Sequence, residues 1–164
     1  AGKFMEFALQ KAGATTVSMP SSENYSAMQT GLLDGMWTSS GSFGAFRMYE
    51  VAKFYNSPED FSVYFTIEPI AISMKTWNRL SPEQQKIFIE VGQGLESAAL
   101  EGAKQEDKRI AELFAKNGVK VEKMTEASWK KWQEWFRQYS FEKFKADVPG
   151  GEALLKAATS GASQ

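Results

Sequence analysis

The serines near residue 40 are the first side chains whose spacing could support catalysis. Residues 40–44 (SGSFG) follow the spacing of a nucleophile elbow, with Ser42 at the nucleophile position and a serine in place of the first glycine. A serine nucleophile needs a neighbouring base, and the chain contains no histidine to serve as one. A lysine base is possible in principle. A serine hydrolase centred on Ser42 therefore stays open beside the simpler alternative of a polar loop.

Composition argues against several other kinds of chemistry. Without histidine or cysteine the chain lacks the commonest transition-metal ligands and a thiol nucleophile, and its acidic residues do not follow the D-x-D-x-D spacing of a calcium loop. The 19 basic and 20 acidic residues leave a net charge of −1, which gives no single-sign field for a nucleic acid. We therefore expect no metal, no cofactor and no nucleic-acid partner.

Two polar loops suit the binding of a small molecule. Ser21 follows a short β-prone run at 15–19, and the WTSS segment at 37–40 closes a second run at 36–38. In an open α/β sheet, ligands bind at the carboxyl ends of the parallel strands, and each loop also leads into a helix N-terminus, which attracts anions. The indole of Trp37 beside hydroxyl groups would supply an apolar wall and hydrogen-bond partners. An ordinary serine-rich loop is the alternative.

The elements that must position these loops alternate along the first third of the chain. The spacing predicts helices over 3–12, 23–33 and 43–54, with Ser22 as the cap of the second, and strands over 15–19 and 36–38. Such alternation is typical of an α/β fold with a parallel sheet. No strand precedes the first helix, so we expect an upstream strand to be missing. Residues 62–74 are also rich in β-prone residues, with a break at Pro69.

A single long helix dominates the middle of the chain. Ser81, Pro82 and Gln84 form a capping box with proline at the first helical position, and the next firm stop is the Asn-Gly pair at 117–118. At 1.5 Å per residue the helix would be roughly 50 Å long, which exceeds the width of a domain of this size. We therefore expect the helix to reach a second lobe.

The C-terminal part carries an aromatic helix. Residues 119–124 alternate as a half-buried strand does, Thr125 is the expected cap of the helix, and residues 148–151 (VPGG) separate it from a short helix at 152–158. One face of the aromatic helix carries Trp129, Trp132, Phe136 and Tyr139. This spacing favours core packing over a ligand platform. We expect the stripe to be exposed unless a partner covers it, and hence the chain to dimerise, swap elements or bind a complementary chain.

The segment at 23–35 (ENYSAMQTGLLDG) carries a family resemblance. It resembles the E-x-Y-x-A-h-Q-x-G-h-h-D-G signature, where h is hydrophobic, of the solute receptors of TRAP transporters, the DctP-like extracytoplasmic solute-binding proteins. The segments AGATTVSMP at 12–20, WNRLSPEQQ at 77–85 and NGVKV at 117–121 are similar to further parts of these receptors, in the expected order. The resemblance covers nearly the whole chain.

The resemblance implies a periplasmic-binding-protein-like α/β fold of two lobes bridged by the long helix. Such a receptor captures a small organic acid in the periplasm, delivers it to the membrane permease and catalyses no reaction. Thr38 stands where the family often has asparagine, and Ser21 where it often has an aromatic residue, so Trp37 is the expected wall of the site. The candidate ligand-binding residues are Ser21, Glu23, Tyr25, Trp37, Thr38, Ser39 and Ser40.

The resemblance also implies that the first, N-terminal lobe is largely missing. We expect residues 1–66 to form most of the second lobe, 67–124 to cross between the lobes, and 125–164 to pack toward the first lobe. The family's ligand-binding arginine precedes residue 3, so we expect impaired binding, and partners that include either the missing lobe or a second copy. Because the sequence starts without methionine, we expect upstream residues, including a signal peptide, to have been removed. A helical or α/β protein-interaction module stays open as an alternative.

Overall fold

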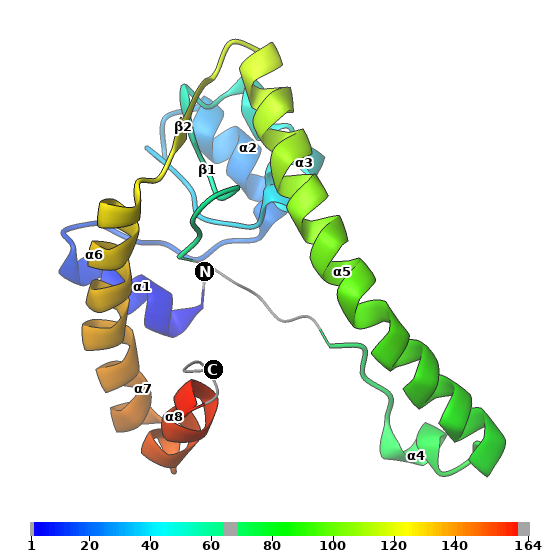
Figure 1. Ribbon diagram of the computed structural model, residues 1–164. Coiled ribbons are helices and arrows are strands. Elements are labelled where there is room, and N and C mark those ends of the chain that lie inside the picture. Colours follow the sequence, from blue (N-terminus) through cyan, green and yellow to red (C-terminus); the bar gives the residue numbers. More distant parts are fainter. Residues whose placement is uncertain (1, 64–68, 161–164) are drawn as a thin grey trace.

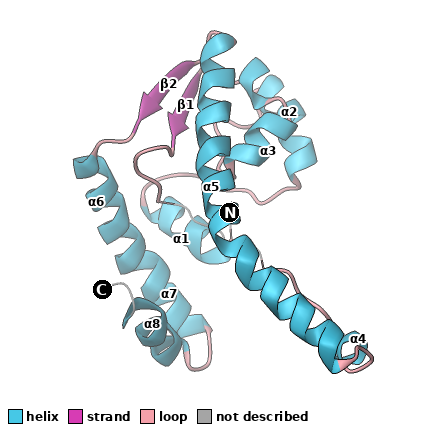
Figure 2. Cartoon of the chain, turned by 45° about the vertical axis from the view of Figure 1, so that its right-hand side comes forward, coloured by secondary structure: helices cyan, strands magenta, loops and turns pink. Residues whose placement is uncertain are grey.

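The computed structural model describes residues 2–63 and 69–160, which form a small body from which two helical arms diverge (Figures 1 and 2). One arm is the N-terminal half of the longest helix, and the other is built from the C-terminal helices. In chain order the elements are α1 (Lys3–Lys11), α2 (Ser21–Gln29), α3 (Ser40–Ala45), the 3₁₀ helix η1 (Met48–Glu50), β1 (Phe54–Ser57), α4 (Met74–Trp77), α5 (Pro82–Lys116), β2 (Lys120–Lys123), α6 (Glu126–Phe136), the π-helix η2 (Arg137–Phe141), α7 (Glu142–Asp147) and α8 (Gly151–Ser160).

The core of the body lies between a two-stranded parallel sheet and the C-terminal half of α5. Strands β1 and β2 pair in parallel, with Tyr55 opposite Val121. Tyr55 and Phe114 pack ring against ring with their centroids 4.4 Å apart. The buried side chains of this core are Met48, Tyr55, Ile110, Ala111, Phe114 and Val119. The parallel α/β architecture that the sequence predicted is confirmed in this body.

Helix α5 confirms the predicted long helix and its first and last residues. The Ser81 side chain accepts from the Gln84 backbone, and the Gln84 side chain accepts from the Ser81 backbone, so the capping box is complete. The helix has 35 residues, and its two halves differ sharply in burial. Residues 82–105 are exposed apart from half-buried Gln85, whereas Ile110 and Phe114 are buried. The exposed half projects from the body, with α4 at its tip (Figures 1 and 2).

The aromatic helix packs on α1 of the same chain. The indole N–H of Trp135 donates to the carbonyl of Ala8 at 2.9 Å, and the Ser140 hydroxyl donates to the carbonyl of Phe4 at 2.9 Å. Phe136 is only 8% exposed, and the other residues of the stripe are half-buried. The stripe is thus partly covered within the chain, because Trp37 packs on Phe136 and the Trp129 indole donates to the carbonyl of Ser62. Dimerisation or swapping stays a prediction. The predicted break at 148–151 and the short helix after it are present.

Four predicted elements differ in the structure. Residues 15–19 and 36–38 are not strands, because within the described residues no backbone hydrogen bond reaches them. The helix predicted over 43–54 is instead α3, η1 and β1, since Arg47 adopts a left-handed φ of 55° that ends helical geometry. Of the β-rich run at 62–74, residues 64–68 lie outside the described residues, and 69–73 form no regular element.

Helix α2 is shorter than predicted and starts differently. It ends at Gln29, and Gly31 follows with a left-handed φ of 74°, so the helix cannot continue to residue 33. Its N-cap position is Pro20 rather than Ser22, and it carries no side-chain cap hydrogen bond. By contrast, Gly13 ends α1 as predicted, with a φ of 94°.

Candidate ligand-binding site

The loop of residues 37–39 leads directly into α3. Ser39 is the N-cap of α3, and its hydroxyl oxygen accepts a hydrogen bond from the Ser42 backbone N–H at 3.4 Å. The Ser39 hydroxyl also donates to Ser42 Oγ at 3.1 Å. Ser42 therefore serves the local geometry of the helix start. Thr38 is half-buried and Ser39 is exposed, so the polar groups of both lie at the surface of this loop.

Trp37 is held at one end of the loop by the aromatic helix. Its ring meets Phe136 of α6 nearly edge-on, with the centroids 5.9 Å apart. Trp132 stacks on the same Phe136 ring at 5.6 Å. Trp37 is half-buried, so part of the indole is available as an apolar wall while the rest is fixed by packing.

Ser40 is held at the other end of the loop by α5. The residue is 8% exposed, and its hydroxyl donates to Asp107 Oδ1 at 2.5 Å. Tyr55 OH lies 3.2 Å from Ser40 Oγ. Burial raises the pKa of the Tyr55 phenol. The Ser40 hydroxyl is thus engaged inside the protein rather than directed at solvent.

The candidates on α2 lie in other surroundings. Ser21 is half-buried at the first turn, and Glu23 is exposed in a shallow concavity that also includes Met19 and Leu32. The Tyr25 hydroxyl donates to Glu50 Oε2 at 3.0 Å, and this hydrogen bond raises the pKa of Tyr25. Glu50 also pairs with Arg47. Hydrogen bonds and ring contacts among the described residues do not join these side chains to the 37–39 loop.

The sequence predicted a ligand loop at 37–40 but not the residues that hold this loop in the structure. Asp107, Tyr55 and Phe136 were not among the candidates. One signal was available for Asp107, because it stands three residues before Ile110 and seven before Phe114, on the helix face that both bury. An acidic residue on an apolar stripe indicates a specific polar partner.

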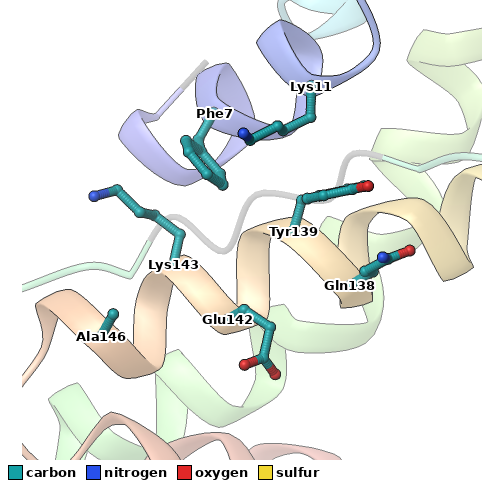
Figure 3. A pocket seen from close by; sticks show the side chains of 7 residues that line it. All are labelled: Phe7, Lys11, Gln138, Tyr139, Glu142, Lys143 and Ala146. Carbon is teal, nitrogen blue, oxygen red and sulfur yellow. The ribbon is translucent and has the colours of Figure 1, made fainter.

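A second concavity lies between α1 and the π-helical region (Figure 3). The Nζ atoms of Lys11 and Lys143 lie 5.3 Å and 5.6 Å from the centre of the Phe7 ring. The concavity is open, and none of the predicted site residues lines it. Its lining consists of Phe7, Lys11, Gln138, Tyr139, Glu142, Lys143 and Ala146.

Two other kinds of feature are absent from the described residues. No group of three or more acidic, histidine or cysteine side chains there is arranged to hold a metal ion. In the same part of the chain, none of the helices has the length and apolar character that crossing a membrane requires.

Comparisons with known proteins agree with this architecture. Residues 2–147 match the family described as bacterial extracellular solute-binding protein, family 7. A solute-binding protein of Albidiferax ferrireducens is 38% identical over 151 residues, which are 92% of this chain and 45% of the relative. The crystal structure of a TRAP periplasmic solute-binding protein from Rhodoferax ferrireducens with bound malonate matches with a TM-score of 0.89 and 35% identity. That match covers 99% of this chain and 53% of the other.

The fold and the matches define a class of protein, the periplasmic receptors of solute transporters. This chain belongs to the family of bacterial extracellular solute-binding proteins, family 7. Such receptors are periplasmic and are not enzymes, so the serine hydrolase and the interaction module are set aside. The chain spans about half the length of the relatives it matches, 45% in one case and 53% in the other.

Proposed function

We propose that this chain forms part of a receptor that captures a small organic acid and delivers it to the permease of a TRAP transporter. The observation that carries the proposal is the match to a TRAP receptor that holds malonate, a dicarboxylate. In this chain the 37–39 loop combines an indole with two hydroxyl groups beside the N-terminus of α3. Hydroxyl and backbone N–H donors suit the oxygens of a carboxylate.

The contact residues that we propose are those with free surface in this region. Trp37 would provide the apolar wall, and Thr38 would donate a hydrogen bond. Ser39 would donate one when its hydroxyl turns from Ser42 Oγ to the ligand. Ser21 is the candidate on α2, because it is half-buried at the end of the extended segment 15–19. Glu23 and Tyr25 would not contact the ligand directly. Glu23 lines the concavity beside Met19, and Tyr25 is bonded to Glu50.

We further propose that the chain binds ligand weakly until the rest of the receptor covers the projecting half of α5. That half exposes large apolar side chains on more than one face: Ile87, Phe88, Ile89, Val91, Leu95 and Leu100. A helix that is apolar on several faces is ordinarily enclosed by other elements, and an exposed apolar surface of this kind marks an interface. The half of the relatives that this chain does not span is the occupant that fits.

The test uses a fusion of this chain to the part of the Rhodoferax ferrireducens protein that it does not cover. We call this fusion the assembled receptor. Calorimetry would compare malonate with malonamide, which has the same shape without the charges. Of these two compounds, we expect only malonate to bind measurably.

Thr38→Val should weaken malonate binding about five- to ten-fold through one lost hydrogen bond. Thr159→Val on α8 is the matched control and should leave the affinity unchanged. Equal binding of both compounds would contradict an organic-acid receptor.

A further inference from the structure

One face of α5 is pressed against α3 at the point where α5 leaves the body. Ser40 bonds to Asp107, and Phe43 meets Phe114 edge-on with the ring centroids 6.1 Å apart. Between these contacts, Gly44 lies so close to Ile110 that an added methyl group would overlap its Cδ1 atom. The contact positions on α5 recur every three or four residues, so a single helix face carries them.

Asp107 lies at the boundary between the exposed and buried halves of α5. Residues before Glu106 are exposed apart from Gln85, Asp107 itself is half-buried, and Ile110 is fully buried. The Ser40–Asp107 hydrogen bond is thus among the first contacts that α5 makes with the body. Ser40 directly follows the 37–39 loop in the chain, so this bond connects the loop to the start of the projecting arm.

The direction of each hydrogen bond in this group follows from its chemistry. An ionised carboxylate only accepts, so Ser40 must give its single hydroxyl proton to Asp107. Ser40 Oγ can then only accept from Tyr55, which donates across 3.2 Å. The result is a relay from Tyr55 through Ser40 to Asp107, with a charged acceptor at its end. Hydrogen bonds to a charged group are shorter and stronger than neutral ones, and partial burial limits competition from water.

We propose that Asp107 is a positioning residue of the ligand site, which fixes the 37–39 loop to α5 through Ser40. The loop is held at two ends, by Phe136 under Trp37 and by Asp107 under Ser40. Thr38 and Ser39 lie between these two fixed points, so the two contacts together determine where their hydroxyl groups lie. This inference rests on the proposed function. It adds a link between the ligand loop and the helix whose other half reaches the rest of the receptor.

The first readout is ligand affinity in the assembled receptor. Asp107→Ala should raise the Kd for malonate about ten-fold, the scale of one hydrogen bond to a charged group. Asp107→Asn, which keeps the shape and one acceptor, should have a smaller effect and guards against misfolding of the alanine variant. In a Ser40→Ala background Asp107→Ala should add no further loss, because the link is already broken. Ile110→Val, on the same helix face, is the control that lowers stability without touching the loop.

The second readout needs no ligand, so it separates this inference from the proposed function. Amide hydrogen exchange over the first turn of α3, where the Phe43 N–H donates to the Ser39 carbonyl at 3.1 Å, should accelerate in Asp107→Ala and Asp107→Asn, and stay unchanged in Ile110→Val. Faster exchange in a receptor that binds no organic acid would support the positioning role and contradict the proposed function. Unchanged exchange at the start of α3 would overturn the positioning role. So would losses of affinity that multiply in the Ser40→Ala, Asp107→Ala double variant.

Discussion

The indole of Trp37 stands at 81° to the ring of Phe136, with 5.9 Å between the two centroids. This contact joins a loop from the first quarter of the chain to a helix from the last quarter. Edge-to-face pairs of this kind contribute about 0.5–1.5 kcal/mol beyond the area that they bury. The C-terminal helix therefore supports the candidate ligand loop within one chain, and this loop covers part of its aromatic face.

Phe136→Ala tests this support. Removing a ring that is 8% exposed should lower the free energy of unfolding by about 3 kcal/mol, because the cavity would lie under both Trp37 and Trp132. Denaturant titration followed by circular dichroism measures the loss, and tryptophan fluorescence should shift to longer wavelength. Phe54→Ala is the matched control, since Phe54 is 66% exposed. Similar losses for both variants would count against a supporting role for Phe136.

Gly44→Ala tests the close approach of α3 to α5. Alanine suits a helix better than glycine, yet here its methyl group would overlap Cδ1 of the fully buried Ile110. We expect a net loss of about 1–2 kcal/mol in the free energy of unfolding. Gly92→Ala, where nothing lies within 4 Å of the added methyl group, should instead gain about 1 kcal/mol.

A compensating substitution sharpens this test. Ile110→Val removes the Cδ1 atom and alone should cost about 1 kcal/mol. Combined with Gly44→Ala it should restore room for the new methyl group, so the double variant should be more stable than the sum of the two losses predicts. Strict additivity would show that the two side chains do not meet.

Ser81→Ala tests the cap of α5. Loss of the capping box should destabilise the start of the helix by about 1 kcal/mol. Because residues 82–105 make few contacts with the body, we expect the effect as faster amide hydrogen exchange over the first turns of α5 and little change in global unfolding. Ser97→Ala, in the exposed middle of the same helix, should not accelerate exchange. Equal acceleration in both variants would contradict capping by Ser81.

The buried phenol of Tyr55 predicts an alkaline dependence of stability. Burial raises its pKa above the ordinary value of 10.0, so the folded chain keeps this proton at a pH where the unfolded chain loses it. The resulting stability is complete below pH 10.0 and declines as the pH rises through the folded pKa. Unfolding titrations between pH 8 and 12 should show the decline, and Tyr55→Phe should make it shallower. An identical pH profile in Tyr55→Phe would contradict the buried phenol.

The elements with strong local signals were predicted well. The start of helix α5 is marked by Ser81, Pro82 and Gln84, and its end by the Asn-Gly pair at 117–118. In the structure all of these residues act as predicted. Strand β2 was predicted from the alternation of residues 119–124, and the Thr125 cap of α6 from its residue type. Side-chain caps and turn glycines act within a few residues, so the sequence alone reveals them.

Features that depend on distant partners were predicted less well. Residues 15–19 and 36–38 have strand-like sequences, but a strand exists only where a neighbour pairs with it, and the described residues offer none. Strand β1 was missed because the aromatic spacing around it also fits a helix, and nothing local marks the left-handed Arg47 that precedes it. For the site, the loop was predicted from its residue types. Asp107 and Phe136 were not, because each reaches the loop across the fold.

Malonate calorimetry on the isolated chain and on the assembled receptor tests the claim that this chain is one part of an organic-acid receptor. We expect saturable, micromolar binding by the assembled receptor and no measurable heat with the 164-residue chain alone, because the chain spans 53% of the malonate-bound structure that it matches. An assembled receptor that folds but binds neither malonate nor another small organic acid would contradict the claim.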